Sequence, residues 1–188
     1  MRPYILLMAA ALTLLGATPP IQENETALRG VEDVEFVAWV TGPESPSQTD
    51  VNYEVDGTDL GSMFGMDDTL YIAFGDTFGC RRKGGGGGGS NWRWNVLAYT
   101  TDRDLEDGIT FDGMIADPDG KARAVLRRLR DDITVIPTAG IAIEGRMYLH
   151  YMAVGHWGPP GEWTLNRSGW AYSDDGGRFW PAETPFVD

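Results

Sequence analysis

Two aspartates, Asp59 and Asp76, flank a predicted β-hairpin. If the turn of this hairpin occupies Met66–Thr69, Gly65 lies opposite Leu70, and counting outward places Asp59 opposite Asp76. Directly opposed side chains in a hairpin have Cβ atoms about 4.5–5.5 Å apart. Two carboxylates at that separation repel each other, so the pair should titrate as a unit with one pKa raised.

A close pair of carboxyl groups can hydrolyse a glycosidic bond, because one acid stays protonated while the other is ionised and acts as base or nucleophile. In the second half of the chain, Ala153 stands where Asp76 would be, and Thr138-Ala139 stand where Asp59 would be. The scaffold itself therefore does not require these acids. Two other interpretations remain open: each aspartate stabilises a turn, or the pair contributes oxygen ligands to a calcium site.

Aromatic and polar residues elsewhere in the chain could hold a sugar chain beside the acids, because aromatic faces stack on sugar rings. The candidate substrate-binding residues are Trp92, Arg93, Asn95, Thr138, His150 and Trp157. Ordinary core packing is the alternative for each tryptophan, and His150 could equally be a hydrogen-bonded strand residue. Two histidines and one cysteine show no metal-binding spacing, so neither a metal nor another cofactor is expected.

Short β-rich runs separated by turn residues must position these side chains. The run Leu70–Phe74 recurs later as Met147–Tyr151, followed in both copies by a strand and an Asp- and Gly-rich turn. Successive units of this kind are typical of β-propeller blades with long loops. The sequence predicts an all-β fold with two adjacent four-stranded antiparallel blades, over about 59–115 and about 133–188.

A turn motif near the end of the second unit supports the propeller prediction. Ser173, Asp175, Gly177 and Trp180 match the Asp box that sialidases and other propellers carry on the blade rim. Such a turn is structural and has no expected catalytic role. Closing a propeller takes four or more blades, so the chain is expected to be an incomplete N-terminal portion of one.

One helix and one loop complete the predicted elements. Residues Asp119–Arg130 place their apolar side chains on one helical stripe, opposite a basic face expected to be solvated. The run Gly84–Gly89 has no side chains to pack, which predicts a mobile surface loop.

The start of the chain predicts export. Residues 1–17 combine Arg2 with an apolar run too short to span a bilayer comfortably, which is typical of a signal peptide. Residues 18–33 are expected to form a linker and 34–188 the partial catalytic propeller. The single cysteine, Cys80, excludes an intrachain disulfide, and an exported protein without disulfides fits a bacterial exoenzyme.

The charge balance limits the partners. Acidic residues outnumber basic ones 28 to 15, which argues against nucleic acid and anionic membranes as partners. No later segment is long and apolar enough to cross a membrane. A secreted or envelope-associated protein acting on a polysaccharide is consistent with all of these features.

Five segments together resemble a known family. They are Thr58–Gly61, Phe74–Phe78, Ile136–Ile141, Leu149–Met152 and Ser168–Gly176. In this order they resemble secreted actinobacterial endo-D-arabinanases, a former family of unknown function that cuts the D-arabinan of mycobacterial-type arabinogalactan and lipoarabinomannan. The resemblance implies a five-bladed propeller with its active site at the mouth of the central channel, and Asp59 and Asp76 as its two acids. The glycine run and the missing C-terminal blades depart from the family pattern.

The favoured hypothesis is therefore a secreted glycoside hydrolase that cleaves internal linkages of an arabinofuranose polymer. One aspartate would protonate the leaving oxygen, and the other would activate water or attack the anomeric carbon. Asp59 as acid and Asp76 as base is the preferred assignment, but residue types alone do not decide between the two. The alternative hypothesis is a non-catalytic propeller that binds sugars or a protein partner at the cell surface. The two differ in one structural expectation. Catalytic carboxyl groups should converge on an open, tryptophan-lined cleft, whereas structural ones should be buried in turn hydrogen bonds.

Overall fold

The computed structural model describes residues 30–80, 88–178 and 180. The predicted signal peptide 1–17, most of the linker 18–33 and most of the glycine run 84–89 lie outside these residues. The chain divides into two compact units, Met1–Glu35 and Phe36–Asp188. All elements described below belong to the second unit.

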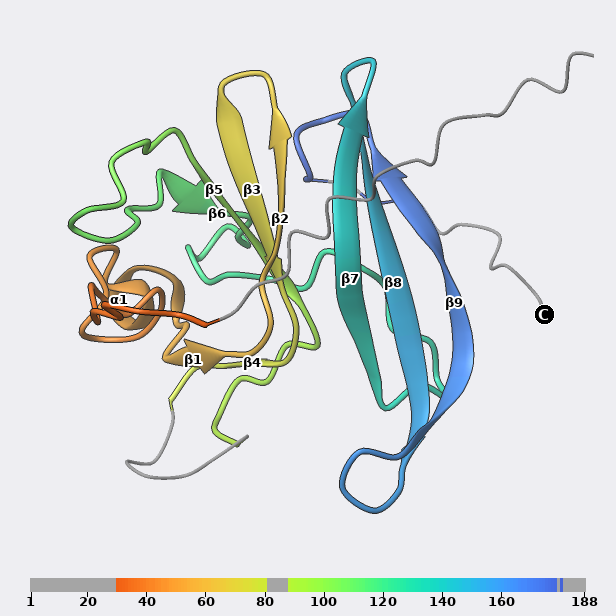
Figure 1. The fold of residues 1–188 in the computed structure, drawn as a ribbon. Helices are drawn as coiled ribbons and strands as arrows, with labels where there is room; N and C mark the ends of the chain where they lie inside the picture. The colour runs from red at the N-terminus through yellow and green to blue at the C-terminus, as the bar shows by residue number, and fades with distance from the viewer. Residues whose placement is uncertain (1–29, 81–87, 179, 181–188) are drawn as a thin grey trace, which may run out of the picture. The chain divides into compact units, whose positions relative to one another are not determined.

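The second unit is built from short antiparallel strands, which confirms the all-β prediction (Figure 1). The elements in chain order are α1 (Thr49–Tyr53), β1 (Gly57–Thr58), β2 (Ser62–Met66), β3 (Thr69–Phe74), β4 (Thr77–Phe78), β5 (Val96–Thr100), β6 (Gly113–Met114), β7 (Thr134–Ile143), β8 (Arg146–Trp157) and β9 (Trp163–Ser173). They form a four-stranded sheet β2-β3-β5-β6, a three-stranded sheet β7-β8-β9 and the small pair β1-β4. The first sheet matches the predicted first blade in strand number and range. The second sheet has three strands among the described residues, where four were predicted.

The β2–β3 hairpin has the predicted register. Gly65 pairs with Leu70, and the turn between the strands is Asp67-Asp68. Asp67 adopts a left-handed φ of 53°, which aspartate tolerates better than most residues at a tight turn. The hairpin register fixes which residues flank its open end.

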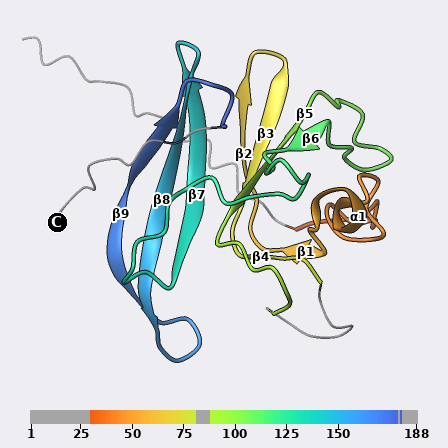
Figure 2. The same cartoon turned by 180° about the vertical axis from the view of Figure 1, so that it is seen from behind.

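One core cluster lies between the two larger sheets, and another packs the first sheet against Val55, Phe111 and Ala122. Phe64, Tyr71 and Leu97 of the first sheet share one buried cluster with Met147 and Leu149 of the second. Strands β2 and β7 lie side by side in both views (Figures 1 and 2). The strands approach closely because β7 carries Gly140 at this point, where an added Cβ would lie only 2.1 Å from the Phe64 ring. A larger residue at Gly140 would push the sheets apart.

The predicted helix Asp119–Arg130 is wrong. No helix forms there, although Val125 and Leu126 are buried as a helical stripe would require. The reason is that the backbone N–H groups of both residues donate to the Asn95 side-chain oxygen, at 2.9 and 3.0 Å. The segment is thereby held as irregular chain against the core. The one described helix, α1, was not predicted from the sequence.

The residues of the Asp-box pattern form one compact turn after β9. The Ser173 hydroxyl donates to the Asp175 carboxylate at 2.7 Å and accepts the Gly177 N–H at 3.0 Å. Gly177 has a φ of +84°, and an added Cβ would lie 2.5 Å from the Leu97 side chain, so glycine is required. Trp180 is buried and donates its indole N–H to the Gly177 carbonyl.

Replacing Asp175 by alanine should therefore cost about 1–2 kcal/mol of unfolding free energy, because the Ser173 hydroxyl loses its acceptor. Chemical denaturation of the native protein and the variant measures this difference. Activity per folded molecule should not change. Native stability combined with lost activity would contradict a structural role for this turn.

No helix among the described residues is long and apolar enough to cross a membrane.

Candidate active site

Asp59 and Asp76 lie opposite each other at the open end of the β2–β3 hairpin, as the register predicts. Thr58 pairs with Thr77 on one side of them and Ser62 pairs with Ala73 on the other. Between these pairs, the Asp59 N–H donates to the Asp76 carbonyl at 3.2 Å, and the Gly75 N–H donates to the Asp59 carbonyl at 3.0 Å. Both acids are therefore held by backbone pairing.

The chain leaves regular geometry directly after Asp59. Leu60 has a φ of 58°, a left-handed conformation that a leucine rarely adopts, and its side chain is 62% exposed. Strain of this kind costs of order 1–3 kcal/mol and concentrates at functional sites. Packing does not account for the strain, since the leucine side chain faces solvent.

The Asp59 carboxyl group lies over Gly75. An added Cβ at Gly75 would be only 2.3 Å from the Asp59 Oδ1 atom, so this position has to be glycine if Asp59 keeps its place. The carboxyl is reached by solvent, but the neighbouring protein displaces part of its hydration. This partial burial raises the pKa of Asp59, and the nearby Asp76 carboxylate raises it further, against smaller opposing backbone hydrogen bonds.

The Asp76 carboxylate has a different environment. Its Oδ1 atom accepts a hydrogen bond from the Trp92 indole N–H at 2.9 Å and another from the Thr134 hydroxyl at 2.7 Å. Together the two donors fix the direction of this carboxylate. The two carboxyl groups thus have different environments: the pKa of Asp59 is raised, and Asp76 accepts two side-chain hydrogen bonds.

Thr134 was not anticipated from the sequence. It is fully buried at the first position of β7, so it reaches Asp76 from the second sheet. The only available signal was a hydroxyl within the apolar run Ile133–Ile136. Asp76 is therefore positioned jointly by both sheets.

Trp92 is the predicted substrate-binding residue that the structure brings to the acid pair. Its side chain is 37% exposed and packs edge-to-face on Trp94. The Arg128 guanidinium lies 5.5 Å from the Trp92 ring centre and 5.1 Å from that of Trp94. Arg128 is exposed, as expected for a solvated residue, and it also makes cation–π contacts with both rings of this aromatic wall.

Three other predicted binding residues lie elsewhere in the second sheet. The Thr138 hydroxyl, next to a β-bulge in β7, is 2.5 Å from the His150 Nδ1 atom in β8. His150 also packs edge-to-face on Trp170 of β9. Trp157, at the end of β8, is 44% exposed and packs edge-to-face on Trp163.

Arg93 and Asn95 are structural residues, which corrects their assignment as substrate-binding residues. Arg93 is 5% exposed, and its guanidinium donates to the Asn91 and Glu54 carbonyls. Asn95 is fully buried and donates to the Val135 carbonyl at 2.9 Å. Neither side chain has surface left for a ligand. Both polar side chains lie inside because they bond backbone groups that no strand satisfies.

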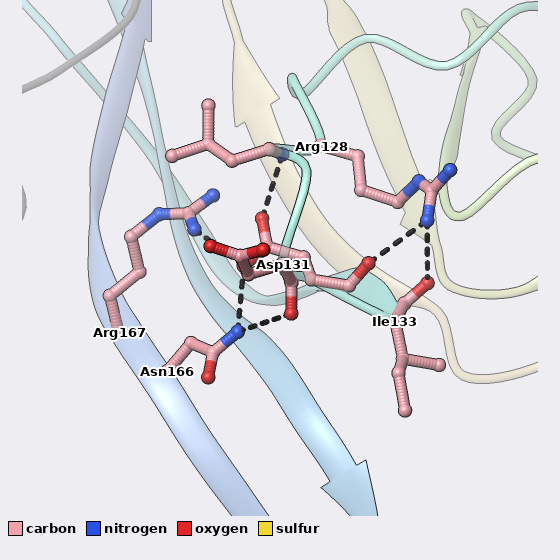
Figure 3. Close-up of polar contacts among 7 residues, drawn as sticks. Arg128, Asp131, Ile133, Asn166 and Arg167 are labelled. Carbon is pink, nitrogen blue, oxygen red and sulfur yellow. Dashed lines mark hydrogen bonds and ion pairs between the residues drawn. The ribbon is translucent and has the colours of Figure 1, made fainter.

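A buried ion pair fixes the chain just before Thr134 (Figure 3). The Asp132 carboxylate accepts from Arg167 of β9 at 2.6 Å, from the Asn166 amide at 3.1 Å and from the Leu129 N–H at 2.8 Å. Burial alone would raise the pKa of Asp132, but the three donors outweigh it and leave that pKa lowered. The network also occupies the amide of Asn166, which donates to the Asp131 carbonyl as well.

Among residues 30–80 and 88–178, no group of three or more histidine, cysteine, aspartate or glutamate side chains is placed to hold a metal ion.

The raised pKa of Asp59 predicts a pH-dependent stability difference. The folded protein holds this proton more tightly than the unfolded chain, so the associated stability is present below the unfolded pKa. That stability is lost as the pH rises through the folded pKa. Asp59→Asn removes the ionisable group, so the variant should be more stable than the native protein at neutral pH and similar to it below about pH 3.8.

Melting temperatures of both proteins across this pH range measure the effect. Asp68→Asn is a matched control, because Asp68 is an exposed aspartate at the far end of the same hairpin. A less stable Asp59→Asn protein at neutral pH would instead indicate a turn-stabilising or cation-binding carboxylate.

Comparison with known families identifies the family of this chain. The model of DUF4185, a domain of unknown function, matches residues 44–185. The chain belongs to the DUF4185 family. Both acids of the candidate site, and the two sheets that hold them, lie inside the matched DUF4185 region.

Two further comparisons say less about this chain than the family match does. No curated protein matches the chain significantly. A crystal structure from Bacteroides ovatus ATCC 8483, provisionally described as a hydrolase, is similar with a TM-score of 0.44 and 13% sequence identity. The similarity covers 64% of this chain and 36% of that one, so the DUF4185 chain spans only about a third of that protein.

Proposed function

We propose that this DUF4185 protein is a secreted glycoside hydrolase that cleaves internal linkages of D-arabinan. The observation that carries the proposal is the opposed pair Asp59 and Asp76, whose carboxyl groups have different environments at the open end of one hairpin. The resemblance of five sequence segments to endo-D-arabinanases supplies the substrate. We also propose that residues 1–17 are a signal peptide that directs export of the protein.

The proposed chemistry divides the work between the two acids. Asp59, with its raised pKa, gives its proton to the glycosidic oxygen as the bond from the anomeric carbon breaks. Asp76, held by Trp92 and Thr134, either takes a proton from the attacking water or attacks the anomeric carbon itself. In the second case water later releases the sugar and returns the proton to Asp59. The net reaction consumes one water, and no step requires a redox partner.

The environment of the pair favours catalysis over a purely structural role. Asp76 accepts hydrogen bonds from side chains of two separate segments, whereas a turn-stabilising aspartate accepts them from its own turn. The partly exposed Trp92 ring beside Asp76 could stack on a sugar. Thr138, His150 and Trp157 are proposed to contact the polymer further along the second sheet.

We also propose that the two sheets are neighbouring blades of a propeller, five-bladed in the family resembled. Support comes from the face-to-face packing of the four-stranded sheet on β7-β8-β9, with β2 and β7 adjacent. In this arrangement Asp59 precedes β2 and Thr134 begins β7, so the candidate site lies at one end of adjacent inner strands.

A panel of polysaccharides tests the proposal. The protein should release oligosaccharides of mixed length from purified D-arabinan, and none from an L-arabinan or a xylan. Chromatography of the products with mass analysis measures this. Binding of D-arabinan without any release would favour the alternative, a non-catalytic sugar-binding module. Cleavage of another glycan alone would keep the hydrolase and overturn the arabinan assignment.

A further inference from the structure

A pocket of about 290 Å³ opens beside β1. Its walls include Trp39, Glu44, Asp56 and Thr58. Thr58 is the last residue of β1 and directly precedes Asp59. Successive side chains of a strand point to opposite faces, so the Thr58 side chain and the Asp59 carboxyl group lie on opposite faces of this segment.

A second contact ties the pocket wall to the other acid. The Thr58 hydroxyl lies 2.8 Å from the hydroxyl of Thr77, which follows Asp76. Thr77 is fully buried and donates to the Gly75 carbonyl. The pocket wall is thus tied to both segments that carry the acids, on the face opposite their carboxyl groups.

The pocket is preformed by buried hydrogen bonds. The Gly42 N–H donates to the Thr49 hydroxyl, which itself donates to the Val55 carbonyl, both at 2.7 Å. Gly42 has a φ of +97°, and an added Cβ would lie 2.8 Å from the Asp56 carbonyl oxygen. The loop between Trp39 and α1 therefore packs directly against the chain that leads into β1 (Figure 1).

The chemistry of the walls fits a neutral sugar. Trp39 is 55% exposed, and Phe36 packs edge-to-face on it at 5.3 Å. Glu44 and Asp56 supply carboxylate oxygens, which accept hydrogen bonds from hydroxyl groups and repel anions. A sugar ring offers both an apolar C–H face and hydroxyl donors. The volume is near the lower end of about 300–1,000 Å³ usual for small-molecule pockets, which suits a single ring.

We propose that this pocket is a sugar-binding subsite on the face of the β1–β4 pair opposite the two carboxyl groups, in which Trp39 is the platform for one ring of the polymer. The inference rests on the proposed function, from which it takes arabinofuranose as the sugar. It adds a binding residue from the segment before α1, outside the two sheets.

Equilibrium binding tests the subsite without relying on turnover. A D-arabinofuranose oligosaccharide is titrated by calorimetry into the Asp76→Asn protein, which should leave it uncut. Adding Trp39→Ala should weaken binding about tenfold, because the stacking surface is removed. Adding Trp39→Phe should largely preserve binding, since an aromatic face remains. Val51→Ala, at a 77% exposed position in α1, is the neutral control.

Each outcome decides a separate point. Equal binding with and without Trp39→Ala, or no binding at all, overturns the subsite. A third outcome is that calcium chloride alone binds, Glu44→Gln abolishes that binding, and no sugar binds. This result would assign the pocket to a cation and would also overturn the subsite. Weaker binding in the Trp39→Ala protein supports the subsite, even if the native protein proves unable to cut arabinan and the proposed hydrolase fails.

Discussion

Replacing Asp76 by asparagine should lower the turnover of arabinan by about 10²–10⁴-fold, since the amide can neither take a proton nor attack the anomeric carbon. Asp59→Asn should cause a loss of similar size, because the leaving oxygen then has no proton donor. In both variants binding of the polymer should change little. The measurement is kcat and the dissociation constant on the same preparations.

Stability separates this account from a structural one. In the Asp76→Asn protein the side-chain amide oxygen can still accept from Trp92 and Thr134, so this variant should fold as the native protein does. A turn-stabilising or calcium-binding role predicts the opposite, with lower stability and retained or calcium-restored turnover. Unchanged turnover in either variant would remove the pair from the chemistry. Asp68→Asn controls for the loss of one negative charge.

Replacing Arg167 by methionine should lower the free energy of unfolding by about 3–5 kcal/mol. The Asp132 side chain is only 1% exposed, and its partner Arg167 is 14% exposed, at an N···O distance of 2.6 Å. Removing the guanidinium leaves a carboxylate charge buried without its counter-ion (Figure 3). Denaturant unfolding of both proteins measures the difference.

A second ion pair in the same sheet is the matched control. Arg146 and Asp174 are also 2.6 Å apart, but their side chains are 43% and 57% exposed. Arg146→Met should therefore cost no more than about 1 kcal/mol. Equal effects of the two substitutions would show that burial does not govern the Asp132–Arg167 pair. A combined Asp132→Asn and Arg167→Met protein should recover part of the loss, because the buried charge is gone.

Local sequence patterns were sufficient to predict the hairpin and the opposition of its acids. The alternation in the two strands allows one register with Asp67-Asp68 at the turn, and that register carries outward to Asp59 and Asp76. A slip by one residue would have moved an acid to the other face. The information was local, because both strands belong to one short segment.

The remainder of the candidate site depends on contacts between distant segments. Thr134 reaches Asp76 across 58 residues, and Asn95 reaches Val135 across 40. No periodicity within one strand indicates which polar side chain of another sheet will face it. The same limit explains the wrong helix at Asp119–Arg130, where Asn95 takes two backbone N–H groups that a helix would have used.

Arg93 and Asn95 show why residue type alone misassigned two binding residues. Both are polar and close in sequence to Trp92, which does reach the acid pair. Trp92 is partly exposed, whereas Arg93 and Asn95 are buried. Their side chains hydrogen-bond backbone groups inside the protein rather than at a surface.

The length distribution of purified D-arabinan after incubation with the protein tests the central claim most directly. Size-exclusion chromatography over time should show the polymer shortening early into fragments of intermediate length with the native protein. The Asp76→Asn protein, added at equal folded concentration, should leave the distribution unchanged. An intact polymer with the native protein, or equal shortening with the Asp76→Asn protein, would contradict hydrolysis by this carboxylate pair.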